Sequence, residues 1–159
     1  MKKCALIIVL ILNVTKSYSQ DILKIKEIDR IVNDINESKF RIESDTLIKD
    51  RPEYGLKMTT YLTAAVDANQ LKKYENFVHT FMSQDGTIRE IKTSSTFYYD
   101  QNELIKVEEY MIEGGNKKTM EWYYSEDKPL FYSSESENAE ERALLLVTIS
   151  KAMLKTIIK

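Results

Sequence analysis

The sequence predicts an α+β protein with one helix at each end of the chain and a six-stranded antiparallel meander between them. Apolar residues recur every three or four positions near both ends, and this period changes to two from Leu56 onward. Five turn-like clusters divide the central stretch at short intervals. The 159 residues include only two prolines and four glycines, so we expect one domain, over residues 20–159, without a linker.

Residues 1–19 are predicted to be a secretory signal peptide. Two lysines precede the apolar run Cys4 to Leu12, and the segment closes on Ser17-Tyr18-Ser19. The run is too short to span a bilayer, which takes about 20 apolar residues. We therefore expect a chain that starts at Gln20, a periplasmic or secreted location, and no membrane span after signal removal. Because Cys4 is the only cysteine, that chain would form no disulfide and no thiolate metal site.

The charge balance argues against nucleic acid as a partner. Cleavage before Gln20 would remove three lysines and no acid, which changes the net charge from −2 to −5. Phosphate binding requires a basic stripe, and the sequence contains none.

The first predicted helix covers Asp21 to Lys39. Five β-branched residues recur there at spacings of three and four, with charged residues between them: Ile22, Ile25, Ile28, Val32 and Ile35. The next segment, Phe40 to Tyr54, has mixed signals, and Pro52 disfavours helix just before it. We predict a loop there, with room for a short strand.

The six strands are predicted near residues 56–66, 71–82, 88–99, 104–113, 117–124 and 129–134. The first of them alternates apolar and polar residues from Leu56 to Val66. The first, third and fifth turns, which begin at Asp67, Asp100 and Ser125, align without gaps. This agreement makes a whole hairpin the repeating unit and places those three turns at one end of the sheet. Internal duplication and shared turn chemistry both explain it.

A second helix is expected at the C-terminal end and must pack on the sheet. Asn138 with Glu141 resembles a capping box, as does Ser134 with Glu137. The predicted apolar side of this helix comprises Leu144 to Val147, Ile149, Met153, Leu154 and Ile157.

Alignment of the repeated turns also predicts which sheet face is core. Val66, Tyr99 and Tyr124 must point the same way, and the core set follows by alternation: Met58, Leu62, Val66, Tyr74, Val78, Ile91, Phe97, Tyr99, Ile105, Val107, Met111, Met120, Trp122, Tyr124, Leu130 and Tyr132. A bulge would reverse part of this assignment. The opposite face presents aromatic side chains among charged ones.

No catalytic, metal or cofactor motif stands out. His79 is the only histidine and lacks an identifiable partner. Asp100-Gln101-Asn102 resembles the start of a calcium-binding loop, but the glycine and the glutamate that such a loop needs later are missing, so a turn is expected. Glu108 and Glu109 are adjacent in a strand, so they face opposite sides and cannot flank one bond. Gly114-Gly115 has the setting of a hairpin turn and not of a phosphate loop. We therefore expect a non-enzymatic protein without cofactor or metal.

The aromatic face is the one feature that points to binding. Its candidate contact residues are Phe77, His79, Phe81, Tyr98, Tyr110 and Tyr123. The competing explanation is that the N-terminal helix or the Phe40 to Tyr54 segment covers this face.

The segment Phe97 to Val107, with its echo from Trp122 to Lys128, resembles the aromatic hairpin units of small exported bacterial proteins without assigned activity. It is more distantly similar to YwqK-type antitoxin repeats. The resemblance covers roughly Tyr61 to Tyr132 and neither helix, and the turn glycine is missing at Glu103 and Lys128. It implies a meander and carries over no functional residue.

Two functions follow as expectations. The first is an exported domain that binds a protein or envelope component through its aromatic sheet face. The alternative is a carrier of an apolar small molecule held between the sheet and the C-terminal helix, in a cavity lined by Tyr74, Trp122 and Met153.

Overall fold

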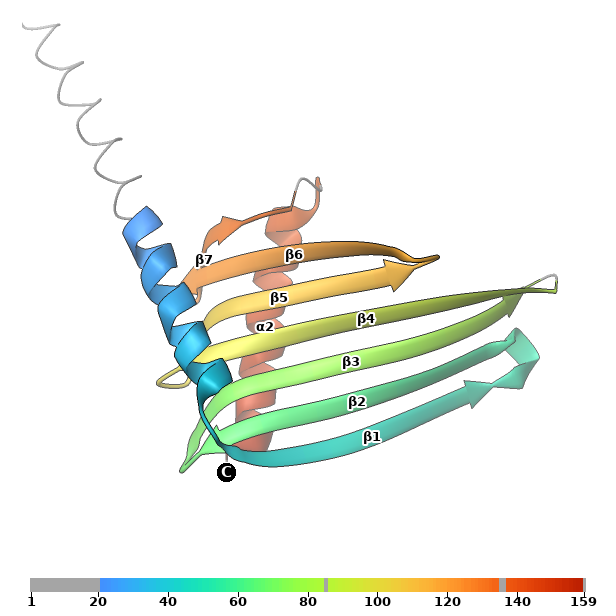
Figure 1. Ribbon diagram of the computed structural model, residues 1–159, viewed down its shortest axis with the longest axis horizontal. Helices are drawn as coiled ribbons and strands as arrows, with labels where there is room; N and C mark the ends of the chain where they lie inside the picture. The colour runs from blue at the N-terminus through green and yellow to red at the C-terminus, as the bar shows by residue number, and fades with distance from the viewer. Residues whose placement is uncertain (1–20, 85, 135–136, 159) are drawn as a thin grey trace, which may run out of the picture.

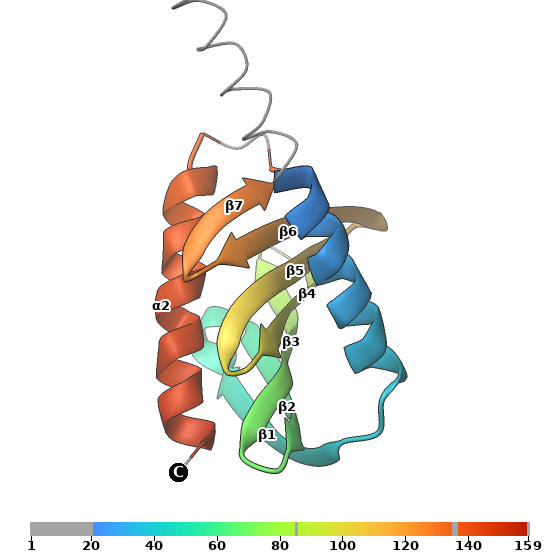
Figure 2. The same cartoon turned by 90° about the vertical axis from the view of Figure 1, so that its left-hand side faces the viewer.

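The computed structural model describes residues 21–84, 86–134 and 137–158. They form three layers, in which a helix lies on each face of one antiparallel sheet (Figures 1 and 2). Residues 21–37 are helical and are called here the N-terminal helix. The elements that follow are β1 (Arg41–Arg51), the 3-10 helix η1 (Pro52–Tyr54), β2 (Leu56–Asp67), β3 (Gln70–Gln84), β4 (Thr87–Asp100), β5 (Glu103–Glu113), β6 (Asn116–Ser125), β7 (Lys128–Tyr132) and α2 (Ala139–Ile157). The α+β class is confirmed, while the predicted signal peptide lies outside the described residues.

The sheet is a meander in the order β1-β2-β3-β4-β5-β6-β7, with every neighbouring pair antiparallel. The predicted turns that begin at Asp67, Asp100, Gly114 and Ser125 are confirmed, the predicted turn at Asp85 falls partly outside the described residues, and the described part of residues 56–132 contains no helix. The turns after Asp67, Asp100 and Ser125 therefore share one end of the sheet, which we call the repeat end. The paired ends of β3 and β4 at Gln84 and Thr87, and the turn at Gly114-Gly115, lie at the other end.

The prediction of six strands was wrong, because a seventh, β1, occupies most of the segment expected to be a loop. All eleven residues of β1 are exposed, so its sequence carries no alternation of buried and solvated positions. Pro52 opens η1 directly after it, and Gly55 then adopts a positive φ of 58°. A Cβ at Gly55 would lie 2.4 Å from the Ser83 carbonyl oxygen, so this tight connection requires glycine.

The three repeated hairpins share one irregularity. The register of β2 with β3 skips Lys72, that of β4 with β5 skips Ile105, and that of β6 with β7 skips Leu130. Each skipped residue is a β-bulge at the same position after its turn. The hairpin repeat inferred from the sequence therefore extends to the pairing of its strands.

The main core lies between the sheet and α2. Its most buried residues include the predicted Val66, Phe97, Tyr99, Val107, Trp122 and Tyr124. Ile105 and Leu130 were predicted on the wrong face, because both pack toward the N-terminal helix. The bulges are the cause, because each one reverses the alternation, and Leu71 and Leu104 fill the core positions nearest their turns. Five other predicted core residues are only partly buried and belong to neither core cluster: Met58, Leu62, Val78, Ile91 and Met111.

The helix α2 begins at Ala139, directly after Asn138, which is the later of the two predicted starts, but no side-chain hydrogen bond caps the helix, so the predicted capping box is not formed. Its N-terminal half is fixed to the sheet by the Tyr124 hydroxyl, which donates to the Ala143 carbonyl at 3.1 Å. Arg142 Nε donates to Glu109 Oε2 at 3.2 Å. Leu144 and Leu145, predicted to be on the apolar side, are exposed, because Ala143, Leu146, Val147 and Ser150 face the sheet instead. In the part of the chain that the structure describes, neither helix is both long enough and apolar enough to cross a membrane.

Candidate functional site

The N-terminal helix covers the repeat end of the aromatic face. Tyr98 and Tyr123 lie beneath it, 3 % and 5 % exposed, in a cluster with Ile28, Val32 and Ile35. These apolar side chains lie on the helix face predicted from their spacing. Two of the six candidate contact residues are therefore enclosed between the helix and the sheet and are inaccessible to a partner while the helix is in place.

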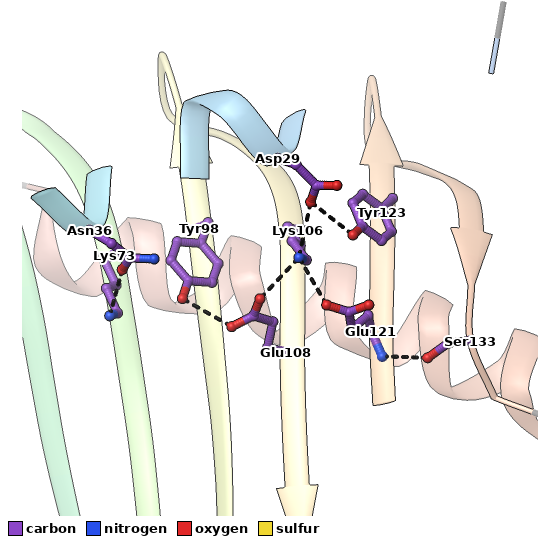
Figure 3. Close-up of polar contacts among 9 residues, drawn as sticks. All are labelled: Asp29, Asn36, Lys73, Tyr98, Lys106, Glu108, Glu121, Tyr123 and Ser133. Atoms are coloured by element: carbon purple, nitrogen blue, oxygen red, sulfur yellow. Dashed lines mark hydrogen bonds and ion pairs between the residues drawn. The ribbon is translucent and has the colours of Figure 1, made fainter. Parts of the chain in front are cut away.

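A buried lysine anchors this helix to the sheet (Figure 3). The side chain of Lys106 on β5 is 6 % exposed, and its Nζ lies 3.1 Å from Asp29, 3.0 Å from Glu108 and 3.0 Å from Glu121. Burial opposes protonation, but hydrogen bonds with Tyr123 and the three carboxylates outweigh it and raise the pKa of Lys106. The ammonium also lies 4.8 Å from the centre of the Tyr123 ring. The cluster thus holds a permanent charge whose partners come from both layers.

The enclosed tyrosines belong to the same polar network. The Tyr98 hydroxyl donates to Glu108 Oε2 at 3.1 Å, and the Tyr123 hydroxyl donates to Asp29 Oδ1 at 2.8 Å. Burial raises the pKa of each phenol to about 12. The Tyr123 contact joins the helix to the sheet, whereas the Tyr98 contact joins β4 to β5 beneath the helix.

The open part of the aromatic face begins beyond the N-terminal helix, where β1 to β4 extend past it (Figure 1). Phe77, His79 and Phe81 follow one another on β3, with ring centres 6.5 Å and 4.3 Å apart. Tyr61 on β2 extends the row, 5.9 Å from Phe77. We call these four residues the aromatic row. Tyr110 stands apart from it, across Ser94 of β4.

His79 has a carboxylate partner that the sequence did not reveal. Its Nε2 lies 2.6 Å from Glu90 Oε1, and Lys92 reaches the same oxygen at 3.0 Å. Hydrogen bonds from Lys92 and His79 lower the pKa of Glu90. The Glu90 side chain is 46 % exposed, so the pair lies in water rather than in the enclosed setting that general acid or base catalysis uses.

An apolar groove lies on the opposite face, between the C-terminal half of α2 and strands β1 to β3. It has a volume of about 500 Å³ and brings Leu62, Ala64 and Tyr74 from the sheet against Ile149, Met153 and Ile157 from the helix. This size is typical of small-molecule sites. Tyr74 and Met153 were predicted to line such a cavity, whereas Trp122 is packed in the main core.

The polar groups of the groove are mostly at its β1 side. Glu43 and Asp45 contribute carboxylates there, and the described lining residues include no lysine or arginine. Arg41 pairs with Glu43 at 2.8 Å, and Asp45 accepts a hydrogen bond from the Thr46 backbone at 2.7 Å. Burial raises the pKa of Tyr74, which keeps its phenol neutral. The groove is therefore apolar along its length and acidic at one margin.

Sequence reasoning missed Glu43 and Asp45 as groove residues because it missed β1. The signal left in the sequence is the order of charges at every second position, with Glu43 and Asp45 before Leu47 and with Lys49 and Arg51 after it, and it marks no buried face. Within the described residues, no group of three or more His, Asp or Glu side chains is arranged to hold a metal ion.

Comparison of the chain with protein-family models, with curated proteins and with solved structures found no match.

Proposed function

We propose that this chain is a non-enzymatic binding domain that holds an apolar small molecule in the groove between α2 and β1 to β3. The observation that carries the proposal is a groove of about 500 Å³ whose walls, from the sheet and from the helix, are predominantly apolar. Burial of alkyl or ring surface between such walls supplies the affinity.

The margin of the groove restricts the head group of the ligand. Glu43 and Asp45 would repel an anionic amphiphile and attract a cationic one. Ser44, Thr63 and Thr156 add backbone or hydroxyl groups near the same space. The best-fitting ligand has an apolar body and a neutral or cationic head group.

Calorimetric titration with decylamine and decanoate, below their micelle concentrations, tests both parts of the proposal. The two probes share one alkyl chain and differ in charge. We expect binding with a negative heat-capacity change, and tighter binding of decylamine. If neither decylamine nor decanoate bound, the proposal would be contradicted. Tighter binding of decanoate than of decylamine would contradict the role of the acidic margin.

A matched pair of variants locates the site. Ala152 is exposed and lines the groove, so Ala152→Trp should fill it and weaken decylamine binding at least about tenfold. Thr148 is exposed on the same helix outside the groove, and Thr148→Trp should leave binding unchanged. Equal effects of the two variants would place the ligand elsewhere.

A second candidate function is the docking of a protein or envelope component on the aromatic row. The observation that favours it is the continuous series Tyr61, Phe77, His79 and Phe81 on the open face. Phe77→Ser and Phe81→Ser should each cost a captured partner about 1 to 4 kcal/mol of binding. The exposed Tyr54 lies outside the row, and Tyr54→Ser is the control.

Both functions are proposed for an exported protein. Intact-mass analysis of the protein from its producing cell should give a chain that starts at Gln20, with or without cyclisation of that residue. A product that retains Met1 would contradict export by signal cleavage.

A further inference from the structure

Strand β1 forms one free edge of the sheet, and this edge is unusually long. β1 has eleven residues, all exposed, and its outward backbone groups face away from β2. The opposite edge, β7, has only five residues and includes Pro129, which lacks a backbone donor. Natural sheets protect exposed edges, so the difference between these two edges calls for a physical explanation.

The charges of β1 are ordered along the strand. Pairing with β2 places Glu43, Asp45, Leu47, Lys49 and Arg51 on the face toward α2, because their partners are Ala64, Leu62, Thr60, Met58 and Leu56. Two acids thus precede a central leucine, and two bases follow it. This order is antisymmetric about Leu47.

We infer that β1 pairs with β1 of a second copy of this chain, antiparallel and centred on Leu47. In this register Glu43 faces Arg51 of the second copy, Asp45 faces its Lys49, and the two Leu47 side chains meet at the twofold axis. Each opposite charge pair occurs twice, and the backbones add about eight hydrogen bonds. The two sheets become one, with both α2 helices on the same side.

Neighbouring registers are less favourable. A shift of two residues in one direction sets Arg41 against Arg51 and Asp45 against Leu47. The opposite shift sets Leu47 against Lys49. A shift of one residue places side chains that face α2 opposite side chains that face away from it. The charge order therefore selects both the partner, a second copy, and the register.

The existing ion pairs of β1 leave this exchange open. Arg41 pairs with Glu43 at 2.8 Å and Arg51 with Glu53 at 3.6 Å, and the side chains of all four are more than half exposed. In the inferred register Glu43 and Arg51 leave these pairs and face each other across the two copies, whereas Glu53 lies in η1, beyond the end of β1. Main-chain pairing of this kind is a recognised mode of association for free sheet edges.

Charge reversal tests the inference. Sedimentation of the full chain at up to about 500 μM and low salt should show a dimer, as expected for a small interface of modest affinity. Lys49→Glu with Arg51→Glu makes the edge acidic, and Glu43→Lys with Asp45→Lys makes it basic. Each double variant alone should dissociate at least about tenfold more readily, and their mixture should form a heterodimer. Because these variants keep residues 1–40 unchanged, association through the N-terminal segment would survive in them.

Cross-linking tests the register. With Cys4→Ser, which removes the only native cysteine, Leu47→Cys should form a disulfide-linked dimer on mild oxidation. Ile48→Cys is the matched control, because residue 48 would face Thr46 of the second copy. The Cα atoms of the two residues 48, one in each copy, would then lie about 8 Å apart, too far for a disulfide. Equal cross-linking of both variants, a monomeric full chain, or dimers that survive in both charge-reversed variants would each overturn the inference. Unchanged melting temperatures confirm that the variants remain folded.

Discussion

Lys106 Nζ lies 3.1 Å from Asp29 Oδ1, and this contact joins the middle of the sheet to the N-terminal helix. The same ammonium also holds Glu108 and Glu121 of the sheet. Without it, three carboxylates would remain close together beneath the helix. The helix therefore depends on one cation as well as on its apolar side.

Lys106→Met should lower the free energy of unfolding by about 2 to 4 kcal/mol. Loss of one partner from a buried ion cluster leaves the others uncompensated, although the partial exposure of these carboxylates reduces the cost. Urea unfolding measures the change. Lys92→Met, at an exposed pair with Glu90, should cost under about 1 kcal/mol. Equal losses in the two variants would argue against the anchoring role of Lys106.

Alkaline pH should destabilise the protein over a defined window. The pKa values of Tyr98 and Tyr123 rise from 10.0 to about 12 on folding. The folded state then binds these protons more tightly, so the stabilisation is complete below pH 10 and is lost as the pH rises toward 12. The raised pKa of Lys106 acts in the same direction above pH 10.5.

Tyr98→Phe isolates one part of this pH dependence. It removes one titrating phenol, so the free energy of unfolding should fall less steeply with pH above pH 10. The slope should differ from that of the unmodified protein by up to about 1.4 kcal/mol per pH unit. At neutral pH the variant loses the hydrogen bonds of the hydroxyl with Glu108 and Asn36, together about 1 to 2 kcal/mol. Urea unfolding across the alkaline range provides the measurement, and an unchanged slope would show that Tyr98 titrates alike in both states.

Trp122→Ala should cost about 3 to 5 kcal/mol. The burial predicted for this residue is confirmed: it is 1 % exposed, in the core that α2 covers. Tyr54→Ala, at an exposed ring on η1, should change stability by under about 0.5 kcal/mol. A small loss at Trp122 would mean that the main core can close over the missing ring.

Glu126→Asn should stabilise the protein by about 0.5 to 1 kcal/mol. Glu126 has a φ of 53° and Asp127 a φ of 59° in the turn between β6 and β7, a conformation that asparagine tolerates better than glutamate. Glu126→Val should destabilise it by about 1 kcal/mol or more, because β-branched residues resist positive φ. Thermal unfolding of the two variants should shift in opposite directions.

Alternation made most of the sheet predictable. Strands β2 to β7 place one set of side chains on the face toward α2, so apolar residues such as Val66, Phe97 and Trp122 recur at the period of a strand. β1 buries neither face, and its apolar Ile42, Leu47 and Ile48 remain exposed. The strand was missed because nothing in its own environment requires a buried side.

The faces of the sheet were predictable only up to each bulge. Counting back from Val107 by twos reaches Ile105, but the unpaired residue at the bulge places Leu104 in the core instead. A bulge is a feature of the pairing between two strands and leaves little trace in either strand alone.

The sequence predicted which residues make up the aromatic face, but it did not predict which of them are covered by other elements. The sequence identified the aromatic side chains, but Tyr98 and Phe77 occupy equivalent alternate positions and differ only in what covers them. That difference depends on the short connection between residue 37 and β1, because its path decides which part of the sheet the N-terminal helix covers. The groove required the position of α2 and a strand that had not been predicted.

The bulges at Lys72, Ile105 and Leu130 make each hairpin a complete module, with its own turn, its own reversal of faces and the same exit direction. Insertion or deletion of one whole hairpin would keep every later strand on its proper side. Loss of a single strand would invert all that follow. A chain of this design can therefore grow or shrink two strands at a time, and its width is open to evolution and to engineering in steps of one module.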